Sequence, residues 1–549
     1  MKLVSLAAAA ALVATPALAQ DAAAPAAAAP PPAPKLIVFI SVDQFSADLF
    51  AEYRSRWSGG FARLQQGAVF PSGYQSHAAT ETCPGHSTLL TGDHPSRTGI
   101  IANDWVDFRT PREDKTVYCS EDESVPGSTS TAYTVSDKHL KVPTLGERMK
   151  AWNPQTRVVS VAGKDRAAVM MGGHKVDELW WWNGKAYVSY AGRAEPRAVT
   201  RANAAVAQRI ATAQPALEVP DFCKPHDRAI PIGAGKTVGA GRFAREAGDA
   251  TRYRASPEFD GATLALAAAL IQDMKLGQGN APDIISVGAS ATDYVGHTYG
   301  TEGLEMCLQL ASLDRDLGDF FDVLDATGVD YVVGLSADHG GHDLPERNRE
   351  DAAPTAQRMD PALRIKAVND VVTAKLGLTG DVLRGGPMGD VWIDPALPKP
   401  QHDRVMTEAI RIIAAHPQVQ AVFTAAQVAA TPQPHSPPET WTLLERARES
   451  YDPERSGDFM IALKPRVTPI PDPTRGSTAT HGSYWDYDRR VPMLFWRKGI
   501  TGFEQPLSVE TVDIAPTLAG VIGMPLKPGE VDGRCLDIVA GPASSCPAR

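Results

Sequence analysis

The chain has 549 residues, of which 43% are hydrophobic, and a formal net charge of -10 at pH 7. This length and composition are typical of a globular protein with a large core, and they exclude a disordered or fibrous chain. The acidic balance argues against nucleic acid as a specific partner, because affinity for a phosphate backbone depends on clustered lysine and arginine.

The N-terminus has the pattern of a secretory signal. Lys2 is followed by an apolar stretch, and Ala17 and Ala19 form the small-residue pattern of a signal-peptidase site. We therefore expect residues 1–19 to be a signal peptide and residues 20–34, rich in alanine and proline, to be a linker. A membrane anchor is the alternative, but the apolar stretch is shorter than the ~20 residues of a span. The expected protein is periplasmic or secreted, with no membrane span after signal removal, and a monomer is our working expectation.

Strand-like and helix-like segments alternate from residue 35 onward. The runs KLIVFISVD, RVVSVAG, DIISVGAS and YVVGLS are typical of buried strands, and long amphipathic segments lie between them. This alternation predicts an α/β fold, a three-layer sandwich with a mainly parallel central sheet. We assign residues 35–549 to one domain, with a smaller and less regular inserted subdomain at about 345–475.

The stretch DELWWWNGKAYVSY predicts a β-hairpin that turns at Asn183 and Gly184, in a type I′ turn. Its three consecutive tryptophans, Trp180, Trp181 and Trp182, are interpreted as side chains packed on the domain. A platform for an aromatic substrate is the alternative interpretation.

Six cysteines in a chain with an export signal permit disulfides. Cys535 and Cys546 are close enough in sequence to form a local pair. The pairing of the other four cannot be deduced from the sequence and is left open; they are Cys83, Cys119, Cys223 and Cys307.

Three strand-like runs end on carboxylates, and two of these carboxylates are soon followed by a histidine. With one isolated histidine in THGS, the set of candidate metal ligands is Asp43, Asp293, His297, Asp338, His339 and His481. An aspartate at a strand end is commonly a turn or helix cap when taken alone. Here the pattern recurs after three strands, and ligands gather beyond the carboxyl ends of strands in such sheets. Three carboxylates and three imidazoles suit two zinc ions.

A further candidate lies in TETCPGHSTLL. Thr82 precedes a Cys-Pro-Gly turn and an apolar stretch that could begin a helix. Its hydroxyl is either a plain helix cap or, beside a metal, a nucleophile. In the second case the helix N-terminus would also direct backbone amides at a bound anion. His86 and His94 are interpreted as structural supports of this segment.

At these residues the chain resembles the alkaline phosphatase superfamily, and within it the secreted bacterial alkaline phosphatases with a threonine nucleophile, the PhoK and PafA type. The resemblance covers about residues 35 to 540 and is weakest in the inserted region. The matching segments are SVDQ at Asp43, TETCPGHST at Thr82, GIIANDW at Asn103, AGKDRA at Lys164 and Arg166, TDYVGHTYG at Asp293 and His297, SADHGGH at Asp338 and His339, and THGS at His481.

The resemblance implies a ligand set and a reaction. One zinc would be held by Asp293, His297 and His481, and the other by Asp43, Asp338, His339 and the Thr82 oxygen. Thr82 would attack phosphorus and form a phosphothreonine, while Asn103, Lys164 and Arg166 hold the other phosphate oxygens.

The implied activity is that of a zinc-dependent alkaline phosphatase, a phosphomonoesterase acting on small-molecule phosphate monoesters. Two cations beside an amide favour a monoester dianion over a diester. A phosphodiesterase or nucleotide pyrophosphatase on the same scaffold is one alternative, and a non-catalytic protein that binds metal and phosphate is the other. An additional structural divalent ion, at His342 and Asp343, is left open.

Overall fold

The strand β1 (Leu36–Val42) is buried along its whole length, because both faces of the sheet are covered. Val38 and Ile40 pack into one hydrophobic cluster, and Ile37 and Phe39 pack into another on the opposite face. Such a strand needs apolar side chains at successive positions, which explains the uninterrupted run KLIVFISV.

The computed structural model describes residues 32–351, 353–540 and 544–547. The expected signal peptide and most of the expected linker lie outside these residues. Within them, no helix is both long enough and apolar enough to cross a membrane.

The main sheet is mainly parallel, as predicted, and in the described residues it contains ten strands in the order β19-β2-β18-β11-β1-β10-β5-β6-β7, with β20 paired to β2. Only β18, between β11 and β2, and the edge strand β7 run antiparallel to their neighbours. The other bounds are β2 (Ala68–Tyr74), β5 (Val158–Ala162), β6 (Glu178–Trp182), β7 (Tyr187–Val188), β10 (Asp283–Ala289), β11 (Tyr331–Ser336), β18 (Arg490–Arg497), β19 (Phe503–Glu504) and β20 (Val509–Glu510).

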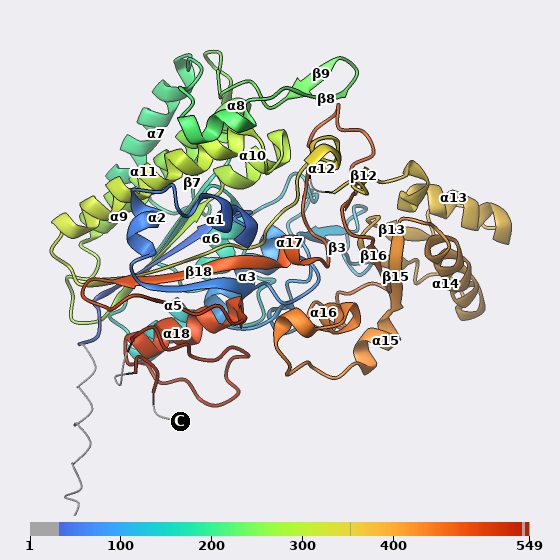
Figure 1. The fold of residues 1–549 in the computed structure, drawn as a ribbon. Coiled ribbons are helices and arrows are strands. Elements are labelled where there is room, and N and C mark those ends of the chain that lie inside the picture. The colour runs from blue at the N-terminus through green and yellow to red at the C-terminus, as the bar shows by residue number, and fades with distance from the viewer. Residues whose placement is uncertain (1–31, 352, 541–543, 548–549) are drawn as a thin grey trace, which may run out of the picture.

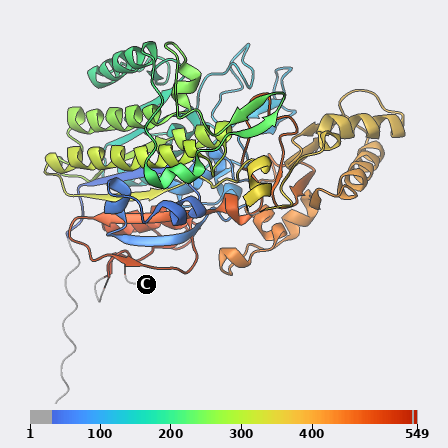
Figure 2. The same ribbon diagram turned by 45° about the horizontal axis from the view of Figure 1, so that its top comes forward.

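Helices cover both faces of this sheet and complete the three layers (Figures 1 and 2). One face packs against α1 (Ala47–Tyr53), α2 (Gly60–Leu64), α7 (Arg197–Ala211), α8 (Ala250–Arg254), α9 (Pro257–Met274), α10 (Ala291–Tyr299) and α11 (Leu304–Ala326). The opposite face packs against α3 (Thr82–Thr91), α5 (Leu145–Trp152), α6 (Asp165–Gly172) and α18 (Ile514–Val521).

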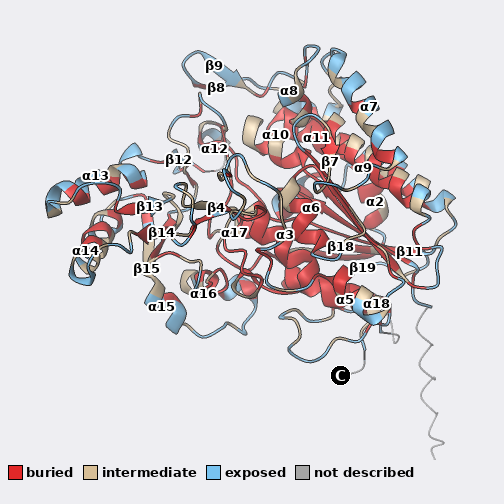
Figure 3. Cartoon of the chain, turned by 180° about the vertical axis from the view of Figure 1, so that it is seen from behind, coloured by how far each residue is buried: buried red, intermediate tan, exposed pale blue. Residues whose placement is uncertain are grey.

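Residues 357–468 form a satellite subdomain beside the sandwich, within the expected insertion (Figure 1). It begins and ends at a parallel bridge between β12 (Gln357–Arg358) and β17 (Val467–Thr468) and has a hydrophobic cluster of its own. The outward faces of its helices are exposed (Figure 3). The region is more regular than its proline-rich sequence suggests, because it contains a four-stranded antiparallel sheet. Its bounds are β13 (Leu383–Gly385), β14 (Gly389–Ile393), β15 (Val419–Thr424), β16 (Phe459–Leu463), α13 (Ile365–Leu376), α14 (Lys399–Ala414), α15 (Ala425–Ala430) and α16 (Leu443–Arg448).

Short elements connect these layers. They are α4 (Pro95–Thr98), β3 (Asp104–Val106), β4 (Thr116–Tyr118), β8 (Ile230–Gly233), β9 (Lys236–Val238), α12 (Pro345–Asp351) and α17 (Asp486–Arg489), with single 3-10 turns at Asp221–His226, Pro361–Leu363, Pro438–Thr440 and Thr511–Asp513.

The predicted tryptophan hairpin is β6 and β7 at the edge of the main sheet. All three tryptophans are at most 6% exposed, so the packed interpretation holds and a substrate platform does not. The predicted type I′ turn is wrong: Trp182 pairs with Tyr187, which leaves a four-residue loop. The Asn183 side chain accepts hydrogen bonds from two backbone amides of this loop, and this local contact stabilises the wider turn.

Three disulfides join the six cysteines. Cys535–Cys546 confirms the predicted local pair, and the structure settles the other two as Cys83–Cys119 and Cys223–Cys307.

Loss of the Cys223–Cys307 bridge is expected to lower the free energy of unfolding by about 4.5 kcal/mol, and loss of Cys535–Cys546 by about 3 kcal/mol. The first bridge spans a sequence separation of 84 and the second only 11, so the first restricts the unfolded chain more. Urea unfolding of the paired Cys→Ala variants would measure both losses. A larger loss from the short bridge would contradict this ranking.

Candidate functional site

The predicted ligands meet at one edge of the main sheet. Asp43 follows β1, Asp338 lies just beyond β11, and Asp293 lies in the first turn of α10, after β10. These three strands are parallel neighbours, so their carboxyl ends share one edge. Because β18 is antiparallel, its beginning lies at the same edge, and His481 is a few residues before it.

Asp293, His297 and His481 form the first group of metal donors, with ligand atoms within 4.8 Å of one another. Asp293 Oδ1 lies 3.3 Å from His297 Nε2 and 3.4 Å from His481 Nε2. The helical spacing of four residues places Asp293 and His297 on one face of α10. Each imidazole Nδ1 is held by a backbone oxygen, of Ala479 for His297 and of Thr80 for His481, and these contacts orient Nε2 towards the carboxylate.

Asp43, His86 and Asp338 form the second group, also within 4.8 Å. His86 Nε2 lies 3.2 Å from Asp43 Oδ1, and His86 Nδ1 lies 3.3 Å from Asp338 Oδ2. His86 therefore contacts both carboxylates of the second group directly, whereas the sequence predicted only that it supports the Thr82 segment. His339 contacts the same carboxylate, with Nε2 3.2 Å from Asp338 Oδ2, and its ring stacks on His481 at 3.5 Å. His339 thus lies between the two groups.

Thr82 is the first residue of α3, and its hydroxyl is buried. The helix packs directly on the second group: a Cβ at Gly85 would lie 1.9 Å from the backbone oxygen of Asp338. Only glycine permits this approach, which explains the Gly of CPGHS. Thr82 is the N1 residue of the helix, and Glu81 is its N-cap, so the plain capping interpretation of Thr82 does not hold.

Several buried oxygen and nitrogen atoms of this site make no hydrogen bond of ordinary geometry, although the carboxylate and imidazole atoms among them lie in ion-pair contact with one another or with Lys164. They are Asp43 Oδ1 and Oδ2, Thr82 Oγ1, His86 Nε2, Asp293 Oδ1, Asp338 Oδ2 and His339 Nε2. Buried polar atoms are costly unless they are paired or coordinate a metal. Their oxygen and imidazole nitrogen chemistry is that of zinc sites, so the residues present fit a pair of divalent ions.

Lys164 joins the two groups. Its Nζ lies 2.5 Å from Asp293 Oδ2 and 3.0 Å from Asp43 Oδ2, with the side chain 1% exposed. Burial disfavours the ammonium, but the carboxylates of Asp293 and Asp43 outweigh it and raise the pKa of Lys164. Arg166, in the first turn of α6, donates to the Tyr118 hydroxyl at 3.3 Å. Both cations therefore lie on the side of the site formed by the end of β5.

Asn103 is fixed to the beginning of α3 by two hydrogen bonds. Its Oδ1 accepts from the backbone N–H of Cys83 at 2.9 Å, and its own backbone N–H donates to Glu81 Oε2 at 2.7 Å. Because the amide oxygen is used as an acceptor, the Nδ2 group is the part of the side chain that can donate to an anion. The Cys83–Cys119 bridge adds a covalent tie, and the N–H of Cys119 donates to the Asn103 carbonyl.

Asp260 of α9 holds the beginning of α10, the helix of Asp293. Its Oδ1 accepts from the N–H of Ala291 at 2.8 Å, and its Oδ2 accepts from Gln309 Nε2 at 2.9 Å. Burial, aided by the charge of Asp43, raises the pKa of Asp260 to about 8.

Sequence reasoning missed Glu81 and Asp260, and it did not place His86 against Asp43 and Asp338. The available signals were weak: Glu81 precedes Thr82, His86 lies one helical turn after it, and Asp260 is an acid in an otherwise apolar helix. The further ion considered at His342 and Asp343 stays a prediction, because His342 Nδ1 and Asp343 Oδ2 make no hydrogen bond while the other atoms of these side chains are paired. Asp343 is paired with Arg347 at 2.6 Å, and His342 Nε2 lies 2.9 Å from Thr468 Oγ1.

The family model of the type I phosphodiesterases and nucleotide pyrophosphatases matches residues 37–484. The chain is 60% identical to alkaline phosphatase PhoK of Sphingomonas sp over 519 residues, which are 93% of this chain and 92% of that protein. The chain belongs to the alkaline phosphatase superfamily. Its group there is the PhoK and PafA type, as the sequence motifs predicted.

Two further similarities extend this assignment. Alkaline phosphatase PhoD of Zymomonas mobilis is 50% identical over 94% of this chain and 90% of its own length. The crystal structure of alkaline phosphatase PafA superposes with a TM-score of 0.80 at 25% identity, covering 93% of this chain and 99% of PafA. The shared architecture confirms the predicted three-layer α/β fold.

Asp260→Asn is expected to remove a pH dependence of stability. The folded protein keeps the Asp260 proton up to about pH 8, whereas the unfolded chain releases it near pH ~4. Between these values the unfolded state binds fewer protons, so the free energy of unfolding falls as pH rises, by up to about 1.4 kcal/mol per pH unit from this group.

Asparagine at position 260 is expected to mimic the neutral acid. Gln309 now donates from Nε2 to Asp260 Oδ2, and its Oε1 has no hydrogen-bond partner. If the Gln309 amide turned over, its Oε1 would accept from the Nδ2 group of the new asparagine. Urea unfolding at several pH values should show that the free energy of unfolding of the variant rises relative to that of the wild type as pH increases. A constant difference between the two proteins would contradict the assigned proton.

Proposed function

We propose that this protein is a zinc-dependent alkaline phosphatase that hydrolyses phosphate monoesters through a covalent phosphothreonine on Thr82. The observation that carries this proposal is the buried, unpartnered Thr82 hydroxyl at the start of α3, packed on the Asp43, His86 and Asp338 group. PhoK, PhoD and PafA, each matched over at least nine-tenths of this chain, are named alkaline phosphatases.

Two zinc ions account for the unpartnered donors. Asp293, His297 and His481 would hold one. Asp43, Asp338, His339 and the Thr82 oxygen would hold the other, with His86 supporting the two carboxylates. When bound, the ions supply Lewis acidity and stabilise negative charge on the reacting oxygens.

The chain's own residues position the reacting groups. The Thr82 hydroxyl would release its proton to solvent, and its oxygen would form a bond to phosphorus while the bond from phosphorus to the ester oxygen breaks. The departing oxygen would take up a proton from solvent and leave as the alcohol. Water then cleaves the phosphothreonine and releases inorganic phosphate. Asn103, Lys164 and Arg166 hold the remaining phosphate oxygens, with Arg166 offering a planar fork and Lys164 a point charge. Phosphoryl transfer requires mainly such positioning and charge stabilisation.

Asn103, Lys164 and Arg166 form what we call the phosphate cradle, and its positive charge favours a monoester. Lys164 and Arg166 together supply two cations for a dianion, and a diester offers only one negative charge. One solved PafA structure is of a variant in which a threonine, an asparagine, a lysine and an arginine are replaced, the same four residue types assigned here. The name of the matching family model keeps phosphodiester hydrolysis as the second candidate.

The site of action follows from the sequence and the disulfides. Residues 1–19 would direct export and be removed by signal peptidase. Residues 20–34 would then form an N-terminal spacer before the catalytic domain, residues 35–549. Three disulfides fit an oxidising compartment, the periplasm or the exterior.

The decisive measurement compares initial rates on p-nitrophenyl phosphate, bis-p-nitrophenyl phosphate and p-nitrophenyl sulfate, before and after chelation and return of zinc. We expect hydrolysis of the monoester to exceed the other two by at least about tenfold, to be lost on chelation and to return with zinc. Replacing Lys164 and Arg166 by alanine should lower the ratio of the monoester rate to the diester rate. A faster diester reaction would move the protein to the phosphodiesterases, and zinc binding without turnover would make it a binding protein.

Thr82→Ala is expected to lower kcat by roughly a thousandfold or more, whereas Thr82→Ser should keep activity within about tenfold, because serine retains the hydroxyl. Thr82 Oγ1 has no hydrogen-bond partner, so neither change should lower the melting temperature much. Rapid quenching of the wild type with labelled ester should trap phosphate on Thr82. Equal kcat values for wild type and Thr82→Ala would remove Thr82 as the nucleophile.

A further inference from the structure

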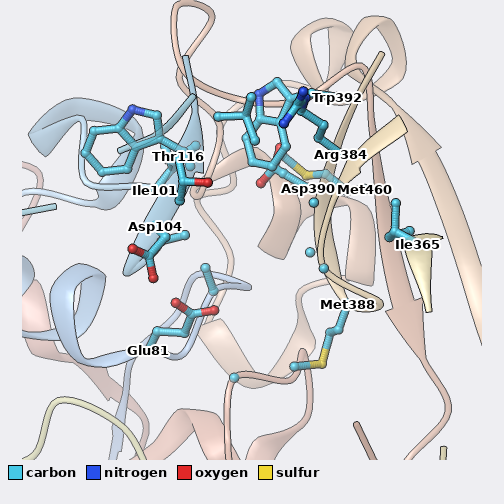
Figure 4. Close-up of a pocket in the computed structure, with 18 of the residues that line it drawn as sticks. Glu81, Ile101, Asp104, Thr116, Ile365, Arg384, Met388, Asp390, Trp392 and Met460 are labelled. Carbon is cyan, nitrogen blue, oxygen red and sulfur yellow. The ribbon is translucent and has the colours of Figure 1, made fainter. Parts of the chain in front are cut away.

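A cavity of about 510 Å³ lies between the beginning of α3 and the satellite subdomain. Figure 4 shows Glu81 and Asp104 on its sandwich side and Met388, Asp390 and Trp392 on its satellite side. This volume is in the range of small-molecule sites, about 300–1,000 Å³. None of the assigned phosphate or metal residues lines it, so the cavity is a separate space beside the candidate site.

The cavity opens beside the phosphate cradle. Glu81, one of its walls, immediately precedes Thr82 and accepts the N–H of Asn103. Gly482, another wall, immediately follows His481, and a Cβ there would lie 3.2 Å from Met388 Cε. Its φ of +103° also favours glycine. Backbone without a side chain at this point leaves the space beside His481 open to the cavity.

The floor of the cavity is apolar and buried. Ile101, Trp105, Leu383, Met460 and Tyr484 line it and are each at most 3% exposed. They come from both the sandwich and the satellite subdomain, so neither part alone would form the pocket. An apolar floor of this kind binds an aliphatic or aromatic group by the hydrophobic effect.

The walls carry excess negative charge. The lining contains four carboxylates, those of Glu81, Asp104, Asp381 and Asp390, against Lys366 and Arg384. Lys366 is already paired with Asp370 at 2.5 Å, and Figure 4 shows Arg384 on the far side, away from Glu81 and Asp104. Burial, with the charge of Glu81 adding to it, raises the pKa of Asp390 to about 7. Glu81, Asp104 and Asp390 therefore place carboxylates on both walls of the cavity, and Arg166 offsets part of the charge of Asp104. Asp390 adds its charge only above about neutral pH.

We propose that this cavity receives the organic group of the phosphate monoester, and that it selects groups with an apolar or aromatic body and a positively charged end. The inference rests on the proposed phosphatase function, because the phosphate held at Thr82 places the organic group beside Glu81 and Gly482. Asp104 and Asp390 act as specificity-determining residues, since a carboxylate attracts an ammonium group and repels an anionic one.

Three esters of one phenol framework test this selection: the phosphate ester of tyramine, para-ethylphenyl phosphate and the phosphate ester of para-hydroxyphenylpropionate. They differ mainly in the charge at the far end. At mildly alkaline pH the carboxylates are ionised and the tyramine ammonium keeps its proton. We expect kcat/KM to fall in the order cationic, neutral, anionic. The double variant Asp104→Asn with Asp390→Asn should narrow the cationic-to-anionic ratio by about tenfold, the scale of a charged contact.

Two controls separate this effect from general damage. Asparagine at 390 can still accept the N–H of Gly457, which Asp390 Oδ1 accepts at 2.6 Å, so the fold around β14 should persist. Inhibition by inorganic phosphate should be unchanged in the double variant, because the phosphate cradle is intact. Glu195→Gln removes an exposed carboxylate from the segment before α7, on the other side of the sandwich, and should leave the ratio as in the wild type.

Binding of tyramine alone, measured by calorimetry, separates the cavity from the catalysis. If no ester is hydrolysed but tyramine binds and the double variant weakens it about tenfold, the phosphatase proposal fails and the cavity stands. If the esters are hydrolysed with equal kcat/KM, or with the same preference in the double variant, the cavity proposal is overturned and the phosphatase stands. If tyramine does not bind and the three esters are not distinguished, the cavity proposal is also overturned.

Discussion

Three carboxylates with almost no solvent exposure share one edge of the sheet, and the rest of the site is arranged around their charge. Asp43 and Asp338 are 0% exposed, and Asp293 is 1% exposed. Their strands are hydrogen-bonded neighbours, and strands in a sheet are about 4.8 Å apart, so the carboxylates cannot separate. Buried like charges are strongly unfavourable unless cations lie beside them. Lys164 and the imidazoles supply part of the positive charge that these carboxylates need, and two divalent ions would supply the rest.

The Thr82 segment is held against this charge by tertiary contacts. Gly85 brings α3 onto the backbone of Asp338, and Glu81 ties Asn103 to the same helix end. The turn after Asp43 is also constrained: Gln44 has a φ of +63°, and its backbone N–H donates to Asp338 Oδ1 at 3.0 Å. A non-glycine residue in this conformation is strained, and such strain is typical of functional sites. The geometry around Thr82 is thus preorganised by the fold.

The satellite subdomain connects the fold to substrate choice. Its strands β14 and β16 supply one wall of the acidic cavity, and the sandwich supplies the other. The phosphate cradle and metal donors belong wholly to the sandwich. Under the proposed function, this division would let one scaffold keep its chemistry while the subdomain sets which organic group fits, as is common for functions carried by loops and insertions on a shared fold.

Much of the fold and of the candidate site could be predicted from the sequence. The apolar runs predicted the central strands, because a strand buried on both faces is a nearly continuous apolar run, which local sequence is enough to show. The spacing of Asp293 and His297 predicted a shared helical face for the same reason. The motifs around Thr82 and Asp338 carried the resemblance to the superfamily, which the comparisons confirm.

The tertiary structure alone decided the contacts between distant segments. It placed His86 between Asp43 and Asp338, Asp260 under α10, and Asp390 opposite Glu81. It also settled the pairing of four cysteines and the wide turn after Trp182. Local pattern encodes period, caps and strand ends, whereas these contacts depend on how helices and sheets pack across hundreds of residues. Local patterns therefore predicted the class of chemistry, and the packing of distant segments decided which side chains surround the candidate site.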